Sequence, residues 1–168
     1  YVKSKNKIKL EILQNKSLEL SLFLSLPATL ALIIASEEIV SALFGYGSFN
    51  EESVKNSALA LFYFALGLPA FSMIKIFSSF IFARNDTKTP FYFSLISVIL
   101  NIVISVSLFS KLGFIIIPIA TSISSWLNGL LLMIFVLNKN YFNFNDSFFI
   151  QLFKIFIVNL ICLGSFKI

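Results

Sequence analysis

The chain has 168 residues, of which 58% are hydrophobic and 12% are charged, whereas soluble domains average roughly 45–50% and about 25%. Its 21 phenylalanines would need a larger core than a chain of this length can form. The composition therefore excludes a soluble globular domain and predicts an all-α polytopic membrane protein. The net charge of +5 resides in short loops, without a basic stripe interleaved with aromatic residues, so we expect no nucleic-acid partner.

Five stretches of the chain are candidates for membrane-spanning helices. A helix crosses the roughly 30 Å hydrocarbon layer with about 20 apolar residues, and the uncharged runs 91–110 and 112–138 meet this length outright. Three further apolar stretches are less clean: 20–36 is short and contains Pro27, 58–83 carries one internal charge, Lys75, and 147–168 is interrupted by Lys154. The predicted helices cover approximately residues 18–43, 56–83, 89–110, 112–138 and 147–168. Both ends of the chain look like cuts, so we expect a fragment of a longer polytopic protein.

The loop charges predict the orientation of these helices. The first, third and fifth loops together contain eight lysines and arginines, against two in the second and fourth. Because positively charged loops stay on the cytoplasmic side, we predict that the N-terminal segment, Arg84–Pro90 and Asn138–Asp146 are cytoplasmic. Glu37–Lys55 and the turn at Lys111 are then on the outer side.

The segment FGYGSF, residues 44–49, combines two glycines with three aromatic residues. Glycine pairs of this kind mark turns, and aromatic side chains favour the headgroup region of a membrane. We therefore predict a turn at the outer interface, with Phe44, Tyr46 and Phe49 at headgroup level. Further along, Gly67 beside Pro69 is the point of greatest flexibility within a span, and it is either a hinge or a static kink.

Lys75 is the most informative side chain of the predicted spans. It precedes Arg84 by nine residues, which is roughly 13 Å along a helix. A lysine at this depth is costly unless it is paired or faces water. It either lines a hydrophilic cavity that attracts an anionic substrate, or it extends its amine to the inner interface. The sequence leaves both interpretations open.

The loop NDTKTP, residues 85–90, ends one helix and starts the next. Asp86 or Thr87 can cap the new helix, and Pro90 suits a first turn because its missing N–H would be unpaired there anyway. For the charges of Arg84, Asp86 and Lys88 we favour a solvated turn that obeys the positive-inside rule.

Polar residues inside the two cleanest spans are predicted to hold helices together. These residues are Asn101 and Asn128, with a small-residue face of Thr121, Ser122, Ser124 and Ser125. Such side chains form interhelical hydrogen bonds and allow close approach. The chain has no histidine, and its single cysteine, Cys162, lies in an apolar run. We expect no metal, no cofactor and no catalytic site, although a membrane enzyme whose catalytic loops lie elsewhere stays an alternative.

Two motifs in this order resemble the MviN/MurJ family of lipid II flippases. The first has the form F-x-Y-G-x-F, and the second is a helix lysine followed by a Y/F-x-R-x-D-x-K-T-P loop. The residues that match are Phe44, Tyr46, Gly47 and Phe49, then Lys75, Phe82, Arg84, Asp86, Lys88, Thr89 and Pro90. The later hairpin, with Gly113 and Asn128, is also similar, so the likeness covers nearly the whole chain.

The resemblance implies a 14-helix exporter with two six-helix lobes and two further helices that form a lipid-binding groove. Residues 1–168 would be part of the C-terminal lobe, roughly the ninth to thirteenth helices. Such a protein moves lipid II, the peptidoglycan precursor, across the bacterial cytoplasmic membrane by alternating access. Lys75 is then the only matched cation deep enough to face the central cavity. The implied partners are lipid II, membrane lipids and, as a candidate, the cell-wall synthesis machinery.

Other functions stay open at this point. Another exporter of the multidrug/oligosaccharidyl-lipid/polysaccharide superfamily, such as an O-antigen flippase or a drug antiporter, is the nearest alternative. A polytopic glycosyltransferase or ligase is a third. Arginines in the first helices of the longer protein would favour an anionic lipid substrate, whereas an acidic cation site there would favour an antiporter.

Overall fold

The computed structural model describes the backbone of residues 2–166 and the side chains of residues 9–145, 148–159 and 161. Within this part of the chain every regular element is helical. The elements are α1 (Val2–Ile34), α2 (Ser36–Phe44), α3 (Glu51–Ala65), α4 (Leu68–Phe82), α5 (Lys88–Leu112), the short 3₁₀ helix η1 (Gly113–Ile115), α6 (Ile116–Asn138) and α7 (Asp146–Phe166). The side chains of Lys3, Lys5, Lys7 and Cys162, and residues 167–168 of the last predicted span, lie outside the described part.

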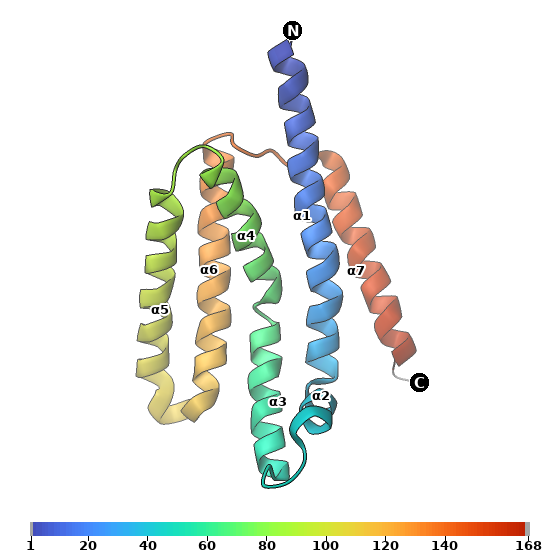
Figure 1. The fold of residues 1–168 in the computed structure, drawn as a ribbon, viewed down its shortest axis with the longest axis vertical. Helices are drawn as coiled ribbons and strands as arrows, with labels where there is room; N and C mark the ends of the chain where they lie inside the picture. Colours follow the sequence, from blue (N-terminus) through green and yellow to red (C-terminus); the bar gives the residue numbers. More distant parts are fainter. Residues whose placement is uncertain (1, 167–168) are drawn as a thin grey trace.

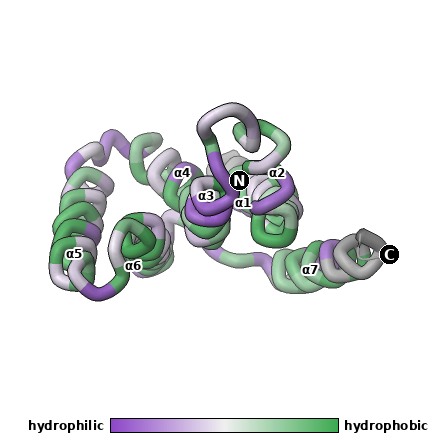
Figure 2. The backbone as a smooth tube through the Cα atoms, turned by 90° about the horizontal axis from the view of Figure 1, so that it is seen from below, coloured by the Kyte–Doolittle hydropathy of each residue, from purple (hydrophilic) through white to green (hydrophobic). Residues whose placement is uncertain are grey.

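The helices stand side by side in an open row (Figure 1). Helix α6 packs against α5, α4 and α3, and α1 packs against α4, α3 and α7. Figure 2 shows that hydrophilic residues gather in the connections between the helices, whereas the helices themselves are mainly hydrophobic. An apolar exterior of this kind suits a protein whose solvent is lipid.

Three stretches of the described residues are long and apolar enough to cross a membrane: Lys9–Ile34, Glu51–Phe82 and Lys88–Asn138. The third is a hairpin, because α5 with 25 residues and α6 with 23 residues run in opposite directions on either side of η1. Each is longer than the roughly 20 residues that a span requires. The prediction of an all-α polytopic membrane protein is therefore confirmed. The described apolar part of α7, Phe148–Asn159, is shorter, so the fifth span stays a prediction.

Two predicted helix boundaries were wrong. The first span was placed at 18–43, but α1 begins at Val2 and ends at Ile34, and α2 forms after a bend at Ala35. Lysine is a good helix former, so the polar N-terminal segment continues the helix to 33 residues, about 50 Å. The second span, placed at 56–83, is two helices separated at Leu66 and Gly67.

Most of the buried core lies at the end of the molecule that carries the α4–α5 and α6–α7 connections. Phe142 of the α6–α7 connection is 1% exposed, and its ring lies 5.9 Å from the ring of Phe77 and 5.6 Å from that of Phe80. The other buried members are Leu18, Leu22, Ile81, Leu132, Val136 and Phe148. A smaller cluster of Val40, Val54 and Ala58, covered by Phe49 and Leu61, closes the opposite end.

Candidate functional site

The α4–α5 loop is organised by Asp86. Its Oδ1 accepts the backbone N–H groups of Lys88 at 3.1 Å and Thr89 at 3.0 Å, and its Oδ2 accepts the Thr89 hydroxyl at 2.6 Å. The two N–H groups belong to the first turn of α5 and have no partner within the helix, so Asp86 stabilises the start of that helix as predicted. The hydrogen bonds from Thr89 and Lys88, with the nearby charge of Lys139, lower the pKa of Asp86. Pro90 is buried in the same turn.

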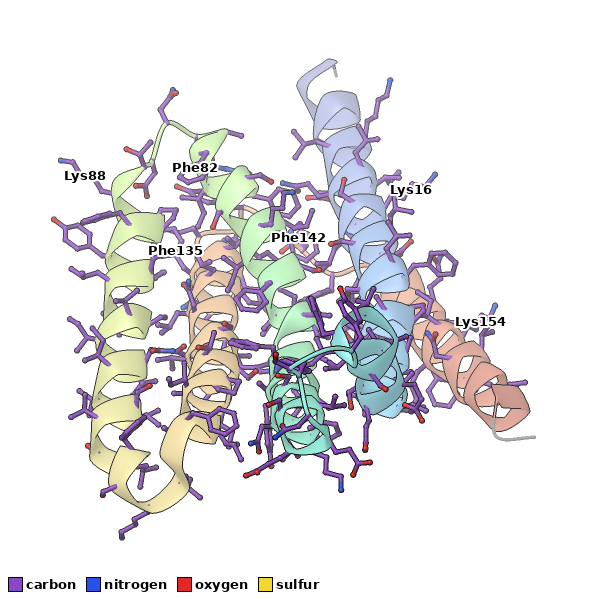
Figure 3. The ribbon with its side chains drawn as sticks, turned by 60° about the horizontal axis from the view of Figure 1, so that its bottom comes forward. Lys16, Phe82, Lys88, Phe135, Phe142 and Lys154 are labelled. Carbon is purple, nitrogen blue, oxygen red and sulfur yellow. The ribbon has the colours of Figure 1, made fainter. Side chains whose placement is uncertain are left out.

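Arg84 differs from the expected solvated turn. Its guanidinium donates to the carbonyl of Phe80 at 2.7 Å and to the carbonyl of Tyr141 at 2.9 Å. The guanidinium carbon also lies 4.1 Å from the centroid of the Tyr141 ring, in cation–π geometry. Arg84 is half-buried by these contacts. Lys88, in contrast, is exposed and points away from the helices (Figure 3).

Helix α1 binds the same α6–α7 connection. The side-chain amide of Gln14 donates to the carbonyl of Tyr141 at 3.2 Å. Asn15 donates to the carbonyl of Asn143 at 2.9 Å and accepts the backbone N–H of Asn145 at 3.2 Å. Sequence reasoning missed Gln14, Asn15 and Tyr141, because nothing in their local sequence indicates partners more than 120 positions apart. Arg84 and these amides join three segments of the chain at one end of the fold.

The break between α3 and α4 is pinned by α6. The backbone N–H of Gly67 donates to the carbonyl of Phe64, three residues earlier, whereas in an α-helix it would donate to that of Tyr63. The Tyr63 carbonyl instead accepts the hydroxyl of Ser122. The indole N–H of Trp126 donates to the Leu66 carbonyl at 3.0 Å. Breaks inside a membrane persist where neighbouring helices satisfy the freed backbone groups.

Gly67 permits this close contact between the break and α6. A Cβ atom there would lie 3.1 Å from the Ser122 hydroxyl and 3.1 Å from the Phe71 ring. The predicted packing role of Ser122 is consistent with its hydrogen bond across the helices, whereas Trp126 was not anticipated. The position of the predicted flexible point therefore coincides with a break held by two side chains of α6.

A polar groove of about 330 Å³ lies between α4, α5 and α6. The amide of Asn101 donates to Thr121 Oγ1 at 3.1 Å and to Ser124 Oγ at 3.4 Å, and the amide of Asn128 donates to Ser94 Oγ at 3.4 Å. Both asparagines thus bond across the α5–α6 hairpin, and their packing role stays a prediction. The Asn128 Oδ1 atom is buried without a partner among the described residues.

Lys75 lies on an exposed face of α4. It does not line the polar groove, although its neighbour Ile74 does. Among the described residues it forms no hydrogen bond and no ion pair. The structure therefore brings Lys75 together with neither Arg84 nor the asparagines, and its role stays a prediction.

The FGYGSF segment is a turn, as predicted. Gly47 has a φ of +66°, a conformation that favours glycine. The Tyr46 side chain is 74% exposed at the tip, whereas the rings of Phe44 and Phe49 lie 6.2 Å apart. Phe49 covers the small core cluster, so its aromatic ring packs on protein rather than standing free at the interface.

The fold and these interhelical polar contacts define a multi-pass α-helical membrane protein. Residues 1–166 match the family model described as lipid II flippase MurJ. The chain belongs to this family, which confirms the resemblance seen in its motifs.

Individual relatives agree with the family assignment. The chain is 46% identical over 120 residues to a probable lipid II flippase MurJ from Rhizobium meliloti, covering 71% of this chain and 22% of that protein. It is 40% identical over 130 residues to the one from Rickettsia prowazekii, covering 77% of this chain and 26% of that protein. A solved structure, "Lipid II flippase MurJ, inward closed conformation", aligns with a TM-score of 0.72 and 26% identity over 97% of this chain and 40% of that chain. The matched segments thus span about a quarter of the two curated relatives and 40% of the solved chain.

Proposed function

We propose that the longer protein containing this chain moves lipid II from the inner to the outer leaflet of the bacterial cytoplasmic membrane, by alternating access, for cell-wall synthesis. The observation that carries the proposal is the match of residues 1–166 to the lipid II flippase family. The alignment of 97% of the chain with a solved lipid II flippase supports it. In this proposal the chain contributes helices of the C-terminal lobe and acts as a transporter rather than an enzyme.

The proposed orientation has the N-terminal segment and the Arg84–Pro90 loop in the cytoplasm. The distribution of lysine and arginine supports it. The α4–α5 and α6–α7 connections lie at one end of the row of helices, and the α2 turn and η1 lie at the other (Figure 1), so that the predicted inner loops share one end. The contacts of Arg84 with Tyr141 would then strengthen the cytoplasmic end of the lobe.

Lys75 is the proposed contact of this chain with the anionic part of the cargo. A diphosphate-linked sugar requires positive charge within a low-dielectric surround, where Coulomb interactions are stronger than in water. Lys75 is exposed and unpaired among the described residues, and it precedes the α4–α5 loop by more than two helical turns. A partner within the longer protein or its cargo would compensate its charge.

Complementation tests this proposal. The full-length protein is expressed in bacteria depleted of their own lipid II flippase, and lysis and precursor accumulation are scored. We expect rescue by the unaltered protein, loss of rescue by Lys75→Ala at equal membrane abundance, and retention by the matched control Lys111→Ala. Failure of a well-expressed parent protein to rescue would overturn the cargo assignment. Rescue by Lys75→Ala would place this lysine outside the transport pathway.

A further inference from the structure

A second groove, of about 580 Å³, lies between α1 and α7. It differs from the polar groove in composition, because it combines apolar walls with charged residues. Leu20, Phe23 and Ile155 form the apolar part, and Lys16, Glu19, Gln151 and Lys154 form the rest. We propose that this groove binds an anionic phospholipid of the surrounding bilayer, with phosphatidylglycerol as the type of lipid.

The position of Lys16 fixes one end of the groove at the predicted inner interface. Its neighbour Asn15 is hydrogen-bonded to Asn143 and Asn145 of the α6–α7 connection. Lys16 therefore lies at the level where α7 begins. Positively charged side chains near a membrane surface attract anionic lipids, and each contributes roughly a five-fold preference.

Lys154 lies deeper than Lys16. It follows the start of α7, at Asp146, by eight residues, which is about 12 Å along the helix. An ammonium group at this depth requires a compensating anion or must extend toward the interface. Figure 3 shows Lys16 on α1 and Lys154 on α7 directed to the same outer flank of the helix pair. Neither lysine has an ion-pair partner among the described residues, so both are available to a phosphate.

The charge balance favours an anionic headgroup over a zwitterionic one. Lys16 and Lys154 contribute two positive charges, and Glu19 contributes one negative charge, so the groove carries a net charge of about +1. A glycerophospholipid phosphodiester carries one negative charge and neutralises it, whereas a phosphatidylcholine headgroup, which is neutral overall, does not. Gln151 supplies an additional donor for a phosphate or hydroxyl oxygen.

The apolar part of the groove suits the acyl chains of the same lipid. Leu20 is 60% exposed and Phe23 is 51% exposed on α1, and both lie further into the predicted membrane than Lys16. Ile155 lines the groove from α7. Leu20 and Phe23 lie between the levels of Lys16 and Lys154, so a phosphate held near Lys16, with the amine of Lys154 extended toward it, would place the acyl chains along these side chains, in the direction in which bilayer lipids extend.

Native mass spectrometry of the full-length protein tests the inference. The protein is exposed to equal amounts of phosphatidylglycerol and phosphatidylcholine with the same acyl chains, and the ratio of the first bound lipid is measured. We expect the double variant Lys16→Gln/Lys154→Gln to lower the phosphatidylglycerol-to-phosphatidylcholine ratio at least five-fold. The control Lys9→Gln/Lys139→Gln removes the same charge from other exposed positions and should leave the ratio unchanged.

Two further variants make the test independent of folding defects. Glu19→Gln removes the opposing carboxylate and should raise the ratio, while Lys16→Arg/Lys154→Arg keeps both charges and should preserve it.

An unchanged ratio in the double glutamine variant would overturn the proposal and indicate that another helix of the longer protein covers the groove. Displacement of phosphatidylglycerol by an equal amount of a polyprenyl phosphate would also overturn it, by assigning the groove to cargo. The measurement reads lipid retention rather than transport, so its outcome is separate from the identity of the cargo.

Discussion

The guanidinium of Arg84 donates a hydrogen bond to the main-chain carbonyl of Tyr141 at 2.9 Å, across 57 positions of the sequence. The same group lies over the Tyr141 ring, and Gln14 of α1 donates to the same carbonyl. One carbonyl thus connects α1, the end of α4 and the segment that leads into α7. This arrangement explains why an arginine stands at this position of the loop: a single planar group can reach two carbonyls and stack on a ring.

Replacing Arg84 by lysine should destabilise the protein. Lysine keeps the charge but lacks the planar fork that contacts Phe80 and Tyr141 together, so the Phe80 carbonyl loses its side-chain donor and the Tyr141 carbonyl keeps only that of Gln14. We expect a loss of about 1–3 kcal/mol in the free energy of unfolding. Thermal unfolding of the purified full-length protein measures it, with the exposed Lys88→Arg as control. Equal stability of the Arg84→Lys variant would show that the contacts with Tyr141 contribute nothing.

Replacing Asp86 by asparagine should change the acid dependence of stability. The pKa of Asp86 is lowered from its ordinary value of 3.8 by the hydrogen bonds of Thr89 and Lys88. The unfolded chain therefore takes up the proton first as pH falls, and the stabilisation that is present above about pH 4 is lost below it. The Asp86→Asn variant should therefore show a smaller decrease in the free energy of unfolding as the pH falls. Unfolding curves between pH 3 and pH 7 measure the difference, and parallel curves for the two proteins would contradict the assignment.

Replacing Trp126 by phenylalanine should weaken the junction of α3 and α4. The change keeps an aromatic side chain and removes the N–H donor of the Leu66 carbonyl. An unpaired carbonyl in an apolar surround costs about 1–3 kcal/mol. Ser122→Ala should have an effect of similar direction through Tyr63, whereas Ser107→Ala, at an exposed serine, serves as the control. The melting temperatures of these variants in one detergent decide whether α6 pins the break.

Replacing Gly67 by alanine tests the close approach of the same helices. The added Cβ would lie 3.1 Å from the Ser122 hydroxyl and 3.3 Å from the Phe64 carbonyl, so α6 or the break must shift. Overpacking of this kind typically costs about 1–3 kcal/mol. Gly129→Ala is a matched control on α6, because its nearest contact would be an ordinary 3.6 Å. Thermal unfolding of both variants measures the difference, and similar losses of stability would contradict a specific contact at Gly67.

Properties that depend on composition and local order could be predicted from the sequence. Long uncharged runs predicted membrane helices because length and hydropathy set insertion. A capping residue at Asp86 or Thr87, followed by Pro90, predicted the start of α5, since a cap acts over three residues. The two glycines of residues 44–49 predicted a turn there, because glycine clusters mark turns. The family could also be recognised from its motifs, because these are local patterns in the chain.

Contacts between distant groups became visible only in the folded structure. The partner of Arg84 could not be read from its loop, because Tyr141 belongs to another connection. The break at Gly67 was visible as a weak point, but its fixation by Ser122 and Trp126 depends on how α6 packs. The groove with Lys16 and Lys154 exists only because α1 and α7 lie side by side. Local propensity acts over a few residues, whereas these contacts require the packing of whole helices, and no short stretch of sequence encodes that packing.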